Sequence, residues 1–186
     1  MTLKRFWVLL FSTVAVGISI GIFYALTGVF GDIRLFFGVE VGGFVAATSL
    51  MGFWAYLMLN FTVRNFLPWR YWVWVQILLV GVVFYDMVYF RYLQFSGGQG
   101  PLFPYVVFAT IPLFWAILVA FLKTRVSGTR SFVPTVFFMY CFTILEWFVA
   151  LKSGIPSVTH IIGTILMGCN AYVILLLGKM VKPQSQ

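Results

Sequence analysis

The sequence predicts an all-α integral membrane protein, a bundle of six transmembrane helices without a soluble domain. Of its 186 residues, 62% are hydrophobic and 9% are charged, whereas a soluble domain has about 25% charged residues. The mean hydropathy is +1.04. Apolar runs long enough to cross a bilayer, about 20 residues, fill nearly the whole chain. We therefore expect a single domain over residues 1–186.

Polar turns divide the chain into the predicted spans. These cover about residues 6–31, 35–63, 71–90, 101–122, 131–151 and 155–178. The first run is too long for the apolar core of a signal peptide and lacks a cleavage site of small residues, so we expect it to remain a helix. Basic turns at 64–70 and 123–130 separate later spans, and the glycine-rich stretch 94–101 is the loop richest in turn residues.

Glycines recur four residues apart in the first two spans. Gly17 and Gly21 share one face of the first helix, and Gly38 and Gly42 share one face of the second. Small residues at this spacing allow another helix to approach closely. We expect these four glycines to form helix-contact faces, used for packing inside the bundle or for docking a partner protein.

Basic residues are distributed unequally between the two ends of the predicted spans. One side carries nine of them: Lys4, Arg5, Arg64, Arg70, Lys123, Arg125, Arg130, Lys179 and Lys182. The other side carries three: Arg34, Arg91 and Lys152. Because cytoplasmic loops are enriched in lysine and arginine, we expect a multi-pass protein of the plasma membrane with both termini in the cytoplasm. The nine residues would then contact anionic lipids at the cytoplasmic face.

Four ionisable side chains are predicted to lie in one layer in the outer half of the bundle. Glu40 and Glu146 each lie six residues from an outer basic residue, and Asp86 lies five residues from one. His160, the only histidine, follows Lys152 by eight residues. At about 1.5 Å per residue, these spacings correspond to depths of roughly 7–12 Å. We also expect Glu146 and His160 to approach within hydrogen-bonding or one-water distance across the short turn between the last two helices.

The role of this polar layer stays open at the level of sequence. An ionisable residue within a span costs roughly 2.5–3.5 kcal/mol on insertion scales, which suggests a functional pocket. The structural alternative is that the acids pair with the ring of Arg34, Arg91 and Lys152 just above them. The mid-span Asn170 is interpreted as a source of hydrogen bonds between helices.

Several function classes find no support in the residues. The sequence contains no metalloprotease, serine hydrolase or nucleotide-binding motif. Cys141 and Cys169 lie mid-span without the spacing of a zinc site or a disulfide framework. We therefore expect no catalytic residues, no metal and no cofactor, and a protein that is not an enzyme. We attribute the net charge of +8 to the membrane surface rather than to nucleic acid.

Two stretches resemble a known family. The segment FVPTVFFMYCFTILEWFVAL at Phe132–Leu151, the segment GCNAYVILLLGKM at Gly168–Met180 and the six-span layout are similar to the KinB-signalling pathway activation proteins (KbaA) of spore-forming Firmicutes. The resemblance implies a plasma-membrane protein that supports activation of a sensor histidine kinase in the sporulation phosphorelay. It supplies no catalytic motif, and it implies a membrane sensor kinase or another membrane protein as partner.

Two functions therefore compete. The first is a non-enzymatic regulator that acts through contact with another membrane protein. The second is a small transporter or solute-binding protein that uses the outer polar pocket of Glu40, Asp86, Glu146 and His160. A transporter is expected to carry polar groups near the midplane as well, and Asn170 is the main such group in the sequence.

Overall fold

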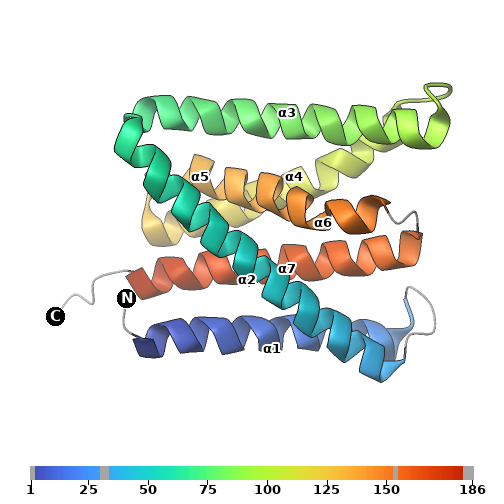
Figure 1. Cartoon of the computed structure of the whole chain (residues 1–186), viewed down its shortest axis with the longest axis horizontal. Coiled ribbons are helices and arrows are strands. Elements are labelled where there is room, and N and C mark those ends of the chain that lie inside the picture. The colour runs from blue at the N-terminus through green and yellow to red at the C-terminus, as the bar shows by residue number, and fades with distance from the viewer. Residues whose placement is uncertain (1–2, 30–33, 153–154, 182–186) are drawn as a thin grey trace. The chain divides into compact units, whose positions relative to one another are not determined.

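A computed structural model describes residues 3–29, 34–152 and 155–181, and within these ranges the protein is helical with no strand (Figure 1). The elements are α1 (Leu3–Thr27), α2 (Leu35–Phe66), α3 (Trp69–Ser96), α4 (Phe103–Ser127), η1 (Thr129–Ser131), α5 (Phe132–Phe137), η2 (Phe138–Phe142), α6 (Thr143–Lys152) and α7 (Pro156–Val181). Counting η1 to α6 as one helix, six helices among the described residues are long and apolar enough to cross a membrane by length and composition. The predicted all-α fold with six long apolar helices is confirmed.

The chain forms two compact units. The first combines residues 1–58 with 142–186 and contains α1, most of α2, α6 and α7. The second comprises residues 59–141 and contains the end of α2, α3, α4, η1, α5 and most of η2. The first and last parts of the sequence therefore lie in one unit, and the middle part forms the other.

In the first unit, α1 and α6 both pack along α7 (Figure 1). The predicted glycine faces lie between α1 and α2. A Cβ at Gly17 would lie 2.5 Å from the carbonyl oxygen of Gly42, and a Cβ at Gly38 would lie 2.6 Å from that of Gly21. No larger residue fits at these contacts without moving the backbone. The four glycines are thus buried against each other inside the unit, which removes them as a surface for a partner protein.

In the second unit, α3 packs on α4 and α5, and α4 also packs on α5. The indole nitrogen of Trp72 donates a hydrogen bond to the Asn60 side chain over 2.8 Å, and its ring meets the edge of Phe137. Helix α3 continues to Ser96, beyond the predicted end at residue 90, and stops where Gly97 adopts a left-handed φ of 58°. A glycine in this conformation is a common end of a helix. The helix therefore ends at Gly97, and not just before the charged residue Arg91 as the sequence predicted.

The fifth predicted span contains a π-helical turn, whereas we expected a continuous helix over residues 131–151. The α-helical bonding pattern is interrupted over Phe138–Phe142. Residues 137–141 are all buried, and Tyr140 donates a hydrogen bond to the carbonyl oxygen of Ala109 in α4 over 3.3 Å. A π turn widens the helix locally and changes the direction of the residues that follow it. The sequence shows no sign of this turn because the segment is apolar on every side.

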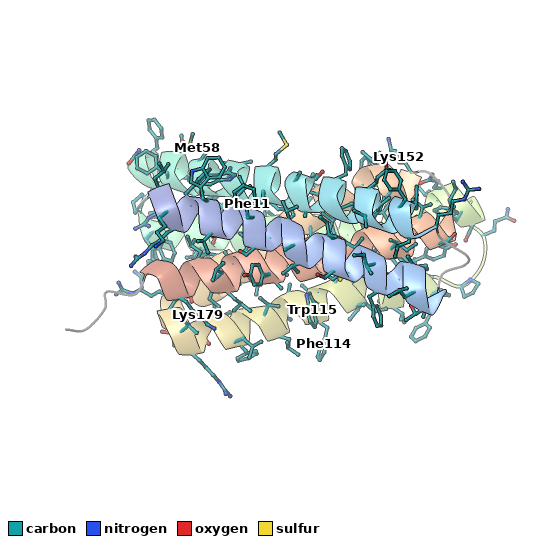
Figure 2. The ribbon with its side chains drawn as sticks, turned by 90° about the horizontal axis from the view of Figure 1, so that it is seen from below. Phe11, Met58, Phe114, Trp115, Lys152 and Lys179 are labelled. Carbon is teal, nitrogen blue, oxygen red and sulfur yellow. The ribbon has the colours of Figure 1, made fainter. Side chains whose placement is uncertain are left out.

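Large apolar side chains cover the outside of both units. Phe11 and Met58 of the first unit are 63% and 70% exposed, and Phe114 of the second is 66% exposed (Figure 2). In the first unit, Lys152 and Lys179 lie at opposite ends of the helices (Figure 2). These two basic residues are ones that the sequence assigns to opposite sides of a membrane.

Candidate functional site

A buried cluster of polar side chains joins three helices of the first unit. Asn170 of α7 is at its centre and is fully buried, as are Ser49 of α2 and Thr143 of α6. The Ser49 hydroxyl donates to Asn170 Oδ1 over 2.6 Å. Asn170 Nδ2 donates to Thr143 Oγ1 and to Glu146 Oε2, both over 2.9 Å. The interpretation of Asn170 as a source of interhelical hydrogen bonds is confirmed.

The remaining oxygen of Glu146 lies against the backbone of α2. A Cβ at Gly52 would overlap with Glu146 Oε1, so a glycine is required at this position for the carboxyl group to fit. Oε1 is buried and has no hydrogen-bond partner among the described residues. The carboxyl group is therefore held between α2 and α7, with one oxygen bonded to Asn170 and the other covered.

We expected Glu146 and His160 to approach within hydrogen-bonding or one-water distance, but the described residues show no hydrogen bond between these two side chains. Glu146 Oε2 is bonded to Asn170, which lies ten residues beyond His160 and therefore about 15 Å further along α7. Side chains on a helix lean toward its N-terminus. Because α6 and α7 run in opposite directions from a short turn, Glu146 leans away from the turn and toward Asn170, while His160 leans back toward the turn. His160 is exposed on the described part of α7.

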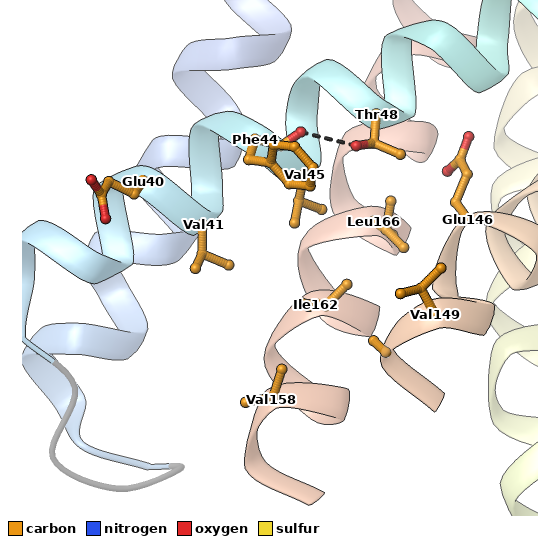
Figure 3. Close-up of a pocket in the computed structure, with 11 residues that line it drawn as sticks. Glu40, Val41, Phe44, Val45, Thr48, Glu146, Val149, Val158, Ile162 and Leu166 are labelled. Carbon is orange, nitrogen blue, oxygen red and sulfur yellow. Dashed lines mark hydrogen bonds between the residues drawn. The ribbon is translucent and has the colours of Figure 1, made fainter. Parts of the chain in front are cut away.

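The two glutamates of the predicted layer line one groove (Figure 3). The groove has a volume of about 530 Å³ and lies between α2, α6 and α7 of the first unit. Its lining comprises Glu40, Glu146, the hydroxyl-bearing Thr48 and eight apolar residues, and no lining residue is basic. The Thr48 hydroxyl donates to the Phe44 carbonyl oxygen of its own helix over 3.1 Å (Figure 3). The groove is therefore an apolar surface that carries two carboxyl groups.

The other members of the predicted layer and ring are not among the residues that line this groove. Asp86 is half-buried in the second unit, and Arg34 is exposed just before α2. The Arg91 guanidinium lies over the rings of Phe108 and Phe95, at 4.0 and 5.1 Å from their centroids. Its Nε and Nη1 are buried without a hydrogen-bond partner in the described part of the chain.

Lys152 likewise lies over an aromatic ring, with Nζ 4.6 Å from the centroid of Phe148. Glu146 is bonded to Asn170 instead of to Lys152. For Arg91 and Lys152, the aromatic face replaces the acidic partner that the structural alternative expected. Such cation–π contacts keep a basic group in apolar surroundings without a counter-ion.

Sequence reasoning missed the hydrogen bond of Ser49 and the mainly apolar lining of the groove. Ser49 lies seven residues after Gly42, on the face of α2 that also carries Val45 and Ala46, and all of these residues are buried. A hydroxyl on a face of small residues was the available signal for a contact between helices. Among the described residues, no group of three or more His, Cys, Asp or Glu side chains lies close enough to hold a metal ion.

Comparison with known proteins gives one consistent result. Residues 6–180 match the family described as KinB-signalling pathway activation in sporulation. The chain is also 30% identical over 146 residues to the KinB-signaling pathway activation protein of Bacillus subtilis (strain 168). That alignment covers 78% of this chain and 74% of the relative. No solved structure matches.

Proposed function

The chain belongs to the KinB-signalling pathway activation family, and we propose on this premise that it is a membrane regulator supporting activation of a sensor histidine kinase in the sporulation phosphorelay. The observation that carries the proposal is the family match, which extends over residues 6–180 and so includes both compact units. A role in activation of the KinB pathway is what the family's description states. The mechanism and the membrane arrangement are our inference.

We place the protein in the plasma membrane as a multi-pass protein. Six helices of the described chain are long and apolar enough to cross a membrane, which supports this location. Many large apolar side chains are exposed on the described helices, and such a surface is unfavourable in water but matches lipid. The nine-to-three distribution of basic residues supports cytoplasmic termini and contact with anionic lipids on that side.

We propose that the protein acts by contact rather than by catalysis. Its polar cluster is consistent with a structural role, because Asn170 bonds Ser49, Thr143 and Glu146 from two other helices. Side chains tied together in this way hold α2, α6 and α7 in place. With the glycine faces used between α1 and α2, the exposed apolar side chains of the spans are the surface left for the kinase's membrane segments.

Deletion of the gene in its host tests the proposal. We expect the deletion strain to lose kinase-dependent phosphorelay output and to sporulate poorly, and a plasmid copy to restore both. Deleting the kinase gene as well should add no further defect, because both proteins act in one pathway. Normal sporulation and normal phosphorelay output in the single deletion strain would contradict the regulatory function.

The alternative of a solute-binding or transport protein is favoured by one observation. The groove in the first unit is open and carries Glu40 and Glu146 on its lining. Uptake assays on purified protein in liposomes separate the two functions. Transport of a solute by liposomes containing the protein, together with a deletion strain that sporulates normally, would decide for transport.

A further inference from the structure

We propose that the groove between α2, α6 and α7 binds a single-chain amphiphile with an ammonium head group, with the head at Glu40 and the chain along the apolar lining. This ligand site is separate from the contact with a kinase proposed above. Its test uses purified protein, so its outcome does not depend on phosphorelay signalling.

The size of the groove suits a small molecule. Its volume of about 530 Å³ lies within the range of roughly 300–1,000 Å³ that is typical of ligand sites. The lining extends along α2 from Glu40 to Thr48, eight residues and therefore about 12 Å. A single hydrocarbon chain fits along a groove of this length and volume.

The lining selects the chemistry of the occupant. Eight of its eleven residues are apolar, which favours a hydrocarbon chain. The two ionisable lining residues are both acidic and none is basic, which disfavours the carboxylate of a fatty acid or another anionic head group. In a protein with 12 basic and 4 acidic residues, two acids on one apolar groove are a local reversal of charge. The complementary head group is a cation.

Glu40 is the carboxylate available to that cation. Glu146 has one oxygen bonded to Asn170 and the other covered beside Gly52. Glu40 is exposed and lies at the other end of the lining, separated from Glu146 by the apolar residues (Figure 3). It follows Arg34 by six residues, about 9 Å along α2. A carboxylate at that depth in a span is unfavourable without a cationic partner.

Binding of dodecylamine to protein in uncharged maltoside micelles, followed by native mass spectrometry, tests the proposal. We expect one molecule to bind to each protein chain, and dodecanol, which has the same chain without the charge, to bind about tenfold more weakly, equivalent to 1.4 kcal/mol. Glu40→Gln should weaken dodecylamine binding by about the same factor and leave dodecanol binding unchanged. Asp86→Asn, which removes one acid from the second unit, is the matched control and should change neither.

A second variant tests the groove itself. Val149 lines the groove and is 78% exposed, so Val149→Trp fills space without disturbing the core. We expect it to abolish binding of both amine and alcohol, while Ile111→Trp, at an exposed position of the second unit, does not. Equal binding of dodecylamine to wild type, Glu40→Gln and Val149→Trp would overturn the proposal. Failure of dodecylamine to bind the wild-type protein would also overturn the proposal, whatever the effect of the variants on signalling.

Discussion

Replacing Asn170 by leucine removes the centre of the buried cluster while keeping a side chain of similar shape. Three hydrogen bonds are lost, of 2.6, 2.9 and 2.9 Å. Bonds between helices in a membrane average about 0.6 kcal/mol each, so their direct loss costs about 2 kcal/mol. A buried acceptor left without a donor costs about 1–3 kcal/mol, and Thr143 and Glu146 each lose one donor. We expect Asn170→Leu to lower the free energy of unfolding by at least about 2 kcal/mol, the direct loss, with about 1–3 kcal/mol more for each acceptor that stays buried without a donor.

The measurement is reversible unfolding in mixed micelles, with a matched control at Gln76. The Gln76 amide is fully buried, and both of its polar atoms lack a hydrogen-bond partner in the described part of the chain. Gln76→Met replaces this amide by an apolar side chain of similar length. Removing a buried polar group without partners is neutral or stabilising, so Gln76→Met should unfold at the same or a higher denaturant concentration than wild type.

A double-mutant cycle isolates one bond of the cluster. Ser49→Ala alone should cost about 0.6 kcal/mol, and in the Asn170→Leu background it should cost less, because its acceptor is already absent. Our reasoning would be refuted if Asn170→Leu cost no more than Gln76→Met, or if Ser49→Ala and Asn170→Leu were fully additive. Either result would mean that the cluster does not couple α2 to α7 energetically.

Three further predictions concern topology and packing. A reporter active only outside the cell should give a signal when fused at Gly98 and none when fused after Gln186; the opposite pattern would reverse the orientation. Gly21→Ala should destabilise the protein, because its Cβ would overlap with the backbone of α2, whereas Gly81→Ala, with no atom within 4 Å of its Cβ, should be neutral or stabilise by up to about 1 kcal/mol. Equal free energies of unfolding for Gly21→Ala and Gly81→Ala would contradict this prediction. Glu146→Gln should retain most of the stability that Glu146→Leu loses, since the amide oxygen still accepts a hydrogen bond; equal losses would contradict it.

The glycine faces show how far sequence reasoning extends. The four-residue spacing of Gly17 with Gly21 and of Gly38 with Gly42 indicated close helix contacts, and the structure places all four in contacts between α1 and α2. The spacing shows which face of a helix carries only glycine, but it does not show which helix packs against that face. The use of these faces inside the unit, rather than for a partner, was therefore decided by the tertiary structure.

The polar layer shows that spacing along the sequence does not predict which side chains meet. The spacing to the nearest basic residue predicts the depth along each helix, and it predicts Glu146 beside His160. The structure instead joins Glu146 to Asn170. The difference arises because side-chain direction and the antiparallel packing of α6 on α7 move the two carboxyl oxygens away from the turn. Asp86 lies in the second unit and does not contribute to the groove.

The amino-acid sequence by itself determined the helical class, the six long apolar segments, the narrow glycine faces and the family. These properties depend on hydrophobicity and spacing within single segments, which are local in the chain. Only the tertiary structure decided the π turn at Phe138–Phe142, the bonds of Asn170 and the groove between Glu40 and Glu146. These features depend on how helices distant in sequence approach and turn toward one another. In a chain that is apolar on almost every face, hydrophobic periodicity carries little information about that arrangement.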